Sequence, residues 1–124
     1  MVNRTRAPGE LEAAIMDVLW RAAAPLAARD IVDHLPGRAP ALTTALTSLD
    51  RLHKKGQVLR TEVDRGVRFQ AVRSAEEHAS QKMLEVLSQT HDRSATLLWF
   101  SGELTAEDVA LLQQAIAART NRDR

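Results

Sequence analysis

Apolar residues recur at the three- and four-residue spacings of one helical face in three stretches of the first half of the chain. These stretches are residues 10–22, 27–35 and 41–55, and proline or glycine stands at their boundaries. In the third stretch the apolar positions share one face, and small polar or basic residues fill the other. That apolar face consists of Leu42, Ala45, Leu46, Leu49 and Leu52. The pattern predicts three helices, the last of which ends at Gly56.

The period shortens after residue 57. Residues 58–63 and 67–72 look extended and are separated by Asp64-Arg65-Gly66, a combination typical of a β-hairpin. The hairpin is basic, with Arg60, Arg65 and Arg68 among its residues. Because two strands alone are only marginally stable in water, the hairpin is expected to pack on the helices.

Helical periodicity returns after the hairpin. Ser74 and Glu77 have the spacing of a capping box, which predicts the start of a fourth helix. A fifth helix is expected over residues 92–101, ending at Gly102. Thr105 is expected to cap a sixth.

The order of three helices and a basic hairpin is that of a winged helix-turn-helix. We expect a mostly α fold with a small β-hairpin wing. Residues 7–73 would form the winged helix-turn-helix DNA-binding domain, 74–119 a three-helix dimerisation region and 120–124 a flexible tail. The third helix would then enter the major groove of double-stranded DNA. The candidate DNA-binding residues are Thr43, Thr44, Thr47, Arg51, Lys54, Lys55, Arg65 and Arg68.

The charge distribution supports a polyanionic partner for the first part of the chain. Residues 1–73 hold 12 Lys and Arg against 8 Asp and Glu, whereas residues 74–124 hold 5 against 8. Each feature alone has a plainer explanation, since exposed threonines suit any solvated helix and Lys54-Lys55 match a helix C-terminus. The alternative is therefore a winged-helix module that binds an acidic protein partner and does not read DNA.

The C-terminal helices contain more apolar side chains than three short helices can bury by themselves. Pairing with a second copy would cover them, so we expect a homodimer. The candidate dimerisation residues are Met83, Leu84, Leu87, Leu97, Leu98, Phe100, Val109, Leu112 and Ile116. The alternative is that these helices fold back onto the winged domain.

Several function classes are excluded by what the sequence lacks. There is no cysteine, so a disulfide framework, a thiolate zinc site and a cysteine nucleophile are ruled out. No two of the four histidines are spaced i, i+4, and there is no Gly-rich phosphate loop. We expect no enzymatic activity, no metal and no cofactor. No stretch has the length of a signal peptide or membrane span, so a cytoplasmic protein is expected.

Four blocks of the sequence carry a family resemblance. They are GELEAAIMDVLW at residues 9–20, TTALT at 43–47, LDRLHKKG at 49–56 and GVRF at 66–69. Together they resemble the BlaI/MecI-type penicillinase repressors, over residues 7–118. The resemblance implies a dimeric repressor that binds inverted-repeat operators and blocks transcription of resistance or stress-response genes.

The resemblance also implies roles for particular residues. It puts Thr43, Thr44, Thr47 and Arg51 on the recognition helix, and Arg65 and Arg68 at the wing. Leu42 stands where related sequences often have Tyr, and Leu46 where some have Arg. Family repressors are often inactivated when a membrane sensor-protease pathway leads to cleavage of an Asn-Phe bond, and Trp99-Phe100 occupies the matching place. The cysteine pairs of the copper-responsive branch are missing.

Overall fold

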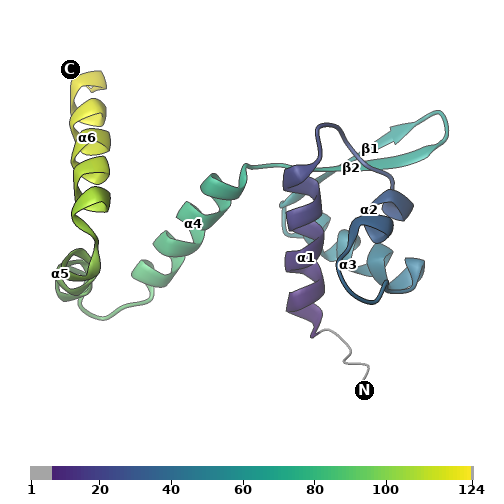
Figure 1. Ribbon diagram of the computed structural model, residues 1–124, viewed down its shortest axis with the longest axis horizontal. Coiled ribbons are helices and arrows are strands. Elements are labelled where there is room, and N and C mark those ends of the chain that lie inside the picture. Colours follow the sequence, from purple (N-terminus) through teal and green to yellow (C-terminus); the bar gives the residue numbers. More distant parts are fainter. Residues whose placement is uncertain (1–6, 124) are drawn as a thin grey trace. The chain divides into compact units, whose positions relative to one another are not determined.

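The computed structural model describes residues 7–123 (Figure 1). The helices and strands are α1 (Pro8–Arg21), α2 (Ala28–His34), α3 (Leu42–Lys54), β1 (Val58–Val63), β2 (Gly66–Ala71), α4 (Ala75–Ser88), α5 (Arg93–Glu103) and α6 (Ala106–Arg122). The predicted mostly helical fold with one hairpin is confirmed. The chain divides into two compact units, Met1–Ala79 and Ser80–Arg124. None of the described helices is long and apolar enough to cross a membrane.

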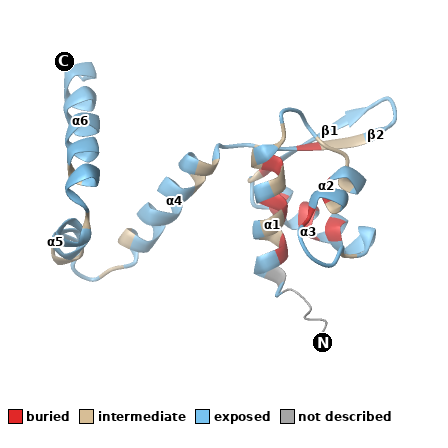
Figure 2. Ribbon diagram, in the orientation of Figure 1, coloured by how far each residue is buried: buried red, intermediate tan, exposed pale blue. Residues whose placement is uncertain are grey.

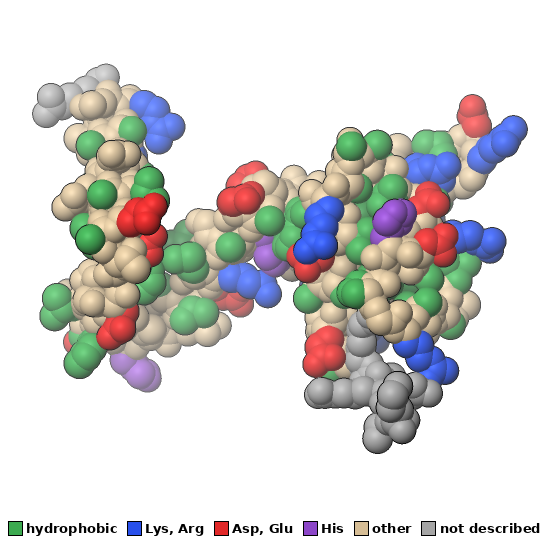
Figure 3. Space-filling model, viewed as in Figure 1, with side chains coloured by type: hydrophobic (Ala, Val, Ile, Leu, Met, Phe, Trp, Pro, Cys, Tyr) green, Lys and Arg blue, Asp and Glu red, His purple; other side chains and the backbone are tan. Residues whose placement is uncertain are grey.

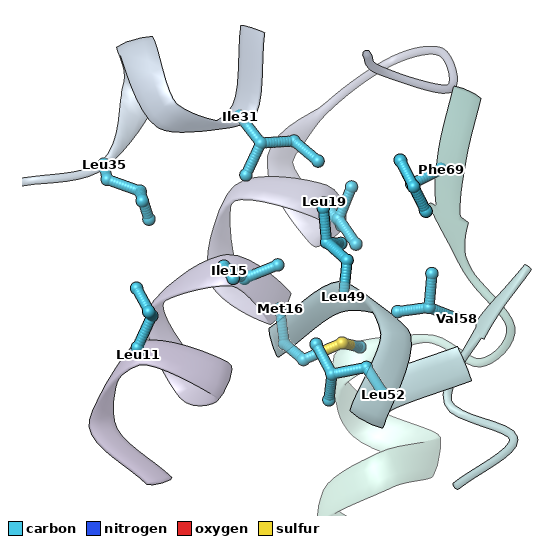
Figure 4. Packing of buried hydrophobic residues seen from close by; sticks show 10 residues of the cluster. All are labelled: Leu11, Ile15, Met16, Leu19, Ile31, Leu35, Leu49, Leu52, Val58 and Phe69. Atoms are coloured by element: carbon cyan, nitrogen blue, oxygen red, sulfur yellow. The ribbon is translucent and has the colours of Figure 1, made fainter. Parts of the chain in front are cut away.

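The core of the first unit lies where α1, α2, α3 and the hairpin meet (Figure 4). Ile15 of α1, Ile31 of α2 and Leu49 of α3 are completely buried. Burying an aliphatic side chain of this size contributes about 1.5–3 kcal/mol. The buried hydrophobic residues of this cluster are Leu11, Ile15, Met16, Leu19, Ile31, Leu35, Leu49, Leu52, Val58 and Phe69. This core fixes α3 and the hairpin relative to each other.

The hairpin is attached to the helices by a short third strand segment between α1 and α2. Leu26 N–H donates to the carbonyl of Phe69 at 2.9 Å, and Phe69 N–H donates to the carbonyl of Leu26 at 2.8 Å. These bonds form an isolated antiparallel bridge on β2. No sequence pattern predicts this bridge, because a single extended residue has no alternation of apolar and polar positions.

The end of α3 follows its sequence signal. Gly56 has φ of 75°, a conformation that side chains with a Cβ rarely adopt. Its N–H donates to the carbonyl of His53 at 3.0 Å, and the N–H of Gln57 donates to that of Leu52 at 2.9 Å. These are the two bonds of a Schellman motif. The predicted helix end at Gly56 is confirmed.

The start of α4 is also local in origin. Ser74 Oγ accepts the N–H of Glu77 at 3.0 Å, and Glu77 Oε1 accepts the N–H of Ser74 at 3.2 Å. The predicted capping box is confirmed. Thr105 likewise caps α6, because its Oγ1 accepts the N–H of Asp108 at 3.1 Å.

Two predicted helix ends in the second unit differ from the structure. Gly102 lies inside α5, which ends at Glu103, because one helical glycine costs only about 1 kcal/mol. α6 continues through Arg122, although residues 120–124 were expected to form a tail. Thr120 Oγ1 donates to the carbonyl of Ile116 at 3.1 Å, so its polar side chain is accommodated within the helix. Arg124 lies outside the described residues.

Candidate DNA interface

The exposed face of α3 is mainly polar, because the opposite, apolar face packs in the core. Ala45, Ser48, Leu49 and Leu52 are buried in α3. Figure 2 shows that the buried residues of this unit lie on the sides of its helices that face one another. Residues three and four apart share a helical face, so Thr43, Thr47, Asp50 and Lys54 lie together on the side away from the core. All four are exposed.

Leu42 and Leu46 differ from the prediction. Both were expected on the apolar face, but their side chains are 38% and 42% exposed. The core covers one side of the apolar stripe and extends beyond it to Ser48, which is 4% exposed, so the opposite edge of the stripe is left uncovered. Residue spacing predicted which positions of α3 form the apolar stripe, but not which of them the core buries. Two leucines therefore lie on the solvent side of α3.

The threonines of α3 differ in what their hydroxyl groups can offer. Thr47 Oγ1 donates a hydrogen bond to the carbonyl of Thr43 at 3.0 Å. The hydroxyl can still accept a bond, but its proton is used within the helix. Such bonds to the carbonyl four positions back are common for helical threonine, so the place of Thr47 inside the predicted helix was the signal that could have revealed it. Thr44, which follows Thr43 in α3, is also exposed.

The lysines at the end of α3 have carboxylate neighbours. Lys54 Nζ lies 3.0 Å from Asp50 Oδ2, with both side chains well exposed. Lys55 Nζ lies 2.9 Å from Glu12 Oε1, and the Glu12 side chain is only 13% exposed. The second pair links α3 to α1 across 43 positions of sequence, so no local pattern could have predicted it. Arg51 is exposed on the same helix.

The hairpin places Arg65 in its exposed turn and Arg68, which is half-buried, on the side away from the core. β1 and β2 pair in antiparallel register, with Thr61 opposite Arg68 and Arg60 opposite Phe69. Since adjacent residues of a strand point to opposite faces, Arg68 points away from the side that buries Phe69. Arg68 Nη1 donates to the carbonyl of Val67 at 3.3 Å. Arg65 is exposed in the turn, and Figure 3 shows basic side chains at this end of the hairpin.

The first unit thus brings together the exposed face of α3 and a hairpin with exposed arginine. The candidate residues lie on this one unit: Thr43, Thr44, Thr47, Arg51, Lys54, Lys55, Arg65 and Arg68. Glu12 was not predicted as part of this site, and its carboxylate pairs with Lys55. Among residues 7–123, no three His, Asp or Glu side chains gather closely enough to hold a metal ion.

In the second unit no described residue of α5 or α6 is buried. The same holds for α4, the helix that enters this unit. The predicted dimerisation residues Leu87 and Val109 are half-buried. The remaining ones are exposed: Met83, Leu84, Leu97, Leu98, Phe100, Leu112 and Ile116. Trp99 is 76% exposed and Phe100 45%, and the bond between them lies in the middle of α5.

Comparison with known proteins identifies the family. The model of the penicillinase repressor family matches residues 8–118. Two relatives named Transcriptional regulator BlaI, from Mycobacterium tuberculosis strains CDC 1551 / Oshkosh and ATCC 25618 / H37Rv, are each 35% identical over 113 residues, which cover 88% of this chain and 82% of the relative.

A solved structure of the zinc-dependent MarR family transcriptional regulator AdcR in its Zn(II)-bound state covers 100% of this chain and 80% of its own, with 17% identity and a TM-score of 0.34. That likeness is too weak to support a fold or a zinc site. The family match spans residues 8–118, and the BlaI relatives align with 88% of this chain. The chain therefore belongs to the penicillinase repressor family and is a DNA-binding transcriptional repressor, not an enzyme.

Proposed function

We propose that this protein acts as a homodimer on an inverted-repeat operator, with α3 in the major groove and the β1–β2 hairpin as the wing. The proposal rests on one observation above all. The exposed face of α3 and the arginines of the hairpin belong to one unit with one core. A helix of this kind fits the major groove, and a basic hairpin beside it can reach the adjacent backbone. The genes it controls would serve resistance or stress responses, and it would act in the cytoplasm.

The geometry suggests a division of roles within the interface. Thr43, Thr44 and Thr47 lie in the first half of α3, where recognition helices approach base edges. Arg51 and Lys54 follow them on exposed positions and suit bases or phosphates further along. Lys55 would contribute less to DNA contact than Lys54, because it is paired with Glu12, whose side chain is only 13% exposed, whereas both partners of the Lys54–Asp50 pair are open to solvent.

The wing would add contacts to the DNA backbone. Arg65 is exposed at the turn, and Arg68 lies on the outward face of the hairpin. Gly66 allows this turn with φ of 120°, a conformation that other residues adopt only under strain. Contacts from these arginines would position the protein on any sequence, whereas α3 would distinguish one sequence from another.

The dimer would form through the second unit. A groove of about 530 Å³ between α4 and α5 is lined mainly by apolar side chains, among them Met83, Leu87, Leu97 and Phe100. Apolar surface left open in this way is typical of a protein interface. A two-fold dimer would also place two copies of α3 on successive major grooves, roughly 34 Å apart. This is the geometry that an inverted repeat requires.

Release of the operator would follow cleavage in the dimerisation region through a membrane sensor-protease pathway. Trp99 and Phe100 are both exposed, which makes the Trp99-Phe100 bond the candidate site. A protease binds an extended chain, so α5 would have to unfold locally first. Co-expression with the sensor, followed by mass spectrometry, tests this step. Intact repressor under full induction would contradict it.

The proposed DNA binding is tested by affinity measurements at several salt concentrations. Each phosphate contact should contribute about −0.9 to the slope of log affinity against log salt. Footprinting on the DNA around the protein's own gene then gives the half-site spacing. A winged-helix module that binds only an acidic protein would protect no DNA segment, and that outcome would overturn the proposal.

A further inference from the structure

Two exposed leucines stand on the helix that is proposed to read DNA, and nothing in the proposed contacts explains them. Leu42 and Leu46 are four positions apart in α3 and are 38% and 42% exposed. Four residues make about one helical turn, so the two side chains are neighbours on the surface of α3. They form an apolar strip along one edge of the face that contains Thr43 and Thr47.

The hydrogen bond of Thr47 extends this apolar character. Its hydroxyl proton is used by the carbonyl of Thr43 at 3.0 Å. What Thr47 then offers to a base is its methyl group and an acceptor oxygen, not a donor. Leu46 and Thr47 are both exposed, so an aliphatic side chain and this methyl group both belong to the part of α3 that faces solvent, although consecutive side chains of a helix do not face each other.

The major groove contains one apolar feature among its polar base edges, which is the C5 methyl group of thymine. A leucine side chain has no donor or acceptor. Placed against a guanine, a cytosine or the amino group of an adenine, it would remove water from polar atoms and leave them without a partner. Against a thymine methyl group it loses nothing and buries apolar surface. The chemistry of this edge therefore selects thymine.

We propose that Leu46 is a specificity-determining residue that packs on a thymine methyl group in each operator half-site. The proposal rests on the DNA binding proposed above and deepens it. It assigns base discrimination at one position to apolar contact, and it leaves the backbone contacts to the basic residues of α3 and the wing.

Uracil supplies a direct test, because it differs from thymine only by the C5 methyl group in the major groove. The best-bound sequence is first selected from randomised double-stranded DNA with the full-length protein. Each thymine of that sequence is then replaced singly by deoxyuridine. At one thymine in each half-site the affinity should fall about fourfold, the effect of exposing one buried methyl group. Elsewhere the affinity should be unchanged.

The Leu46→Ala variant shows whether this residue senses the methyl group. Leu46 is outside the core and alanine favours helices, so the variant should fold, which circular dichroism checks. Its ratio of affinities for thymine and uracil at the sensitive position should fall to about one. Leu59→Ala is the matched control, because Leu59 is 46% exposed but lies on the hairpin. It should keep the ratio of the unaltered protein. In Leu46→Arg the preferred base should shift towards guanine, whose O6 and N7 accept a bidentate arginine.

The outcomes separate this inference from the function on which it depends. If no DNA is bound with a steep salt dependence, the proposed function itself fails. If a selected operator is bound but no single uracil weakens it, the inference is overturned and DNA binding stands. Leu46→Ala with an unchanged thymine-to-uracil ratio would also overturn it, and would assign the methyl contact to another residue.

Discussion

The indole Nε1 of Trp20 donates a hydrogen bond of 2.9 Å to the main-chain carbonyl of Arg73. The same indole lies against His78, with ring centroids 5.3 Å apart and the rings tilted by 53°. Trp20 is near the end of α1, whereas Arg73 and His78 lie on either side of the start of α4. One side chain therefore holds the chain that leaves the hairpin, together with the first turn of α4, on α1.

Replacing Trp20 by phenylalanine should isolate the hydrogen bond. Phe keeps an aromatic ring near His78 but has no N–H to donate to Arg73. A typical intramolecular hydrogen bond contributes about 1 kcal/mol, so Trp20→Phe should lower the free energy of unfolding by about that amount. Urea titration at one fixed protein concentration measures it, since the stability of the proposed dimer would depend on concentration. Gln70→Ala, at an exposed position of β2, is the control, and an equal loss in both variants would contradict the role of this bond.

Asp50 places a negative charge on the face of α3 that is proposed to meet DNA. Its carboxylate lies 3.0 Å from the ammonium group of Lys54 and partly neutralises it. Asp50→Asn should therefore strengthen binding to operator and non-operator DNA alike. The expected gain is about fivefold, because unit charges 4 Å apart in water interact by about 1 kcal/mol. Fluorescence anisotropy with both DNAs measures it.

Asp17→Asn is the matched control for this charge effect. Asp17 is exposed on α1, outside the proposed contacts, so its neutralisation should change affinity much less. A selective loss of operator binding in Asp50→Asn would contradict the repulsion. It would instead make Asp50 a base-reading residue, since a carboxylate can accept the amino group of cytosine.

The features that the sequence predicted correctly are those whose interacting residues lie close together along the chain. The glycine that ends α3 and the Ser74–Glu77 box act within five residues, and both were visible as local patterns. The contacts of Trp20 with Arg73 and of Leu26 with Phe69 join residues far apart in sequence. Those partners are chosen by packing of the whole unit, which residue spacing does not encode.

The helix α3 shows both situations in one element. Its position and its polar face followed from periodicity, and they are present in α3. The exposure of Leu46 did not follow, because the extent of the core over a helix depends on what packs beside it. Nor did the pairing of Lys55 with Glu12. The basic residues expected to contact phosphate thus looked more alike in sequence than their surroundings are in the structure.

Lys54 and Lys55 should behave differently although they are adjacent. Lys54→Met removes an exposed charge from the proposed interface and should make the salt slope of DNA binding shallower by about one. Lys55→Met removes the partner of Glu12, so it should leave the slope nearly unchanged and lower stability by up to about 1 kcal/mol. Salt-dependent anisotropy and urea titration of both variants measure the two effects. An equally shallow slope in Lys55→Met would show that this lysine does contact phosphate.

The proposed dimer depends on the apolar groove between α4 and α5. Leu97 lines this groove and is 46% exposed, so in the lone chain an aspartate there would meet solvent. In a dimer the same aspartate would be a buried charge without a partner, which is strongly unfavourable. Leu97→Asp should therefore give a folded monomer in sedimentation equilibrium and lose binding to an inverted repeat much more than to a single half-site. Ala13→Asp is the control, because Ala13 is exposed on α1, outside the proposed dimer and DNA contacts. A dimer that persists in Leu97→Asp would place the interface elsewhere on the second unit.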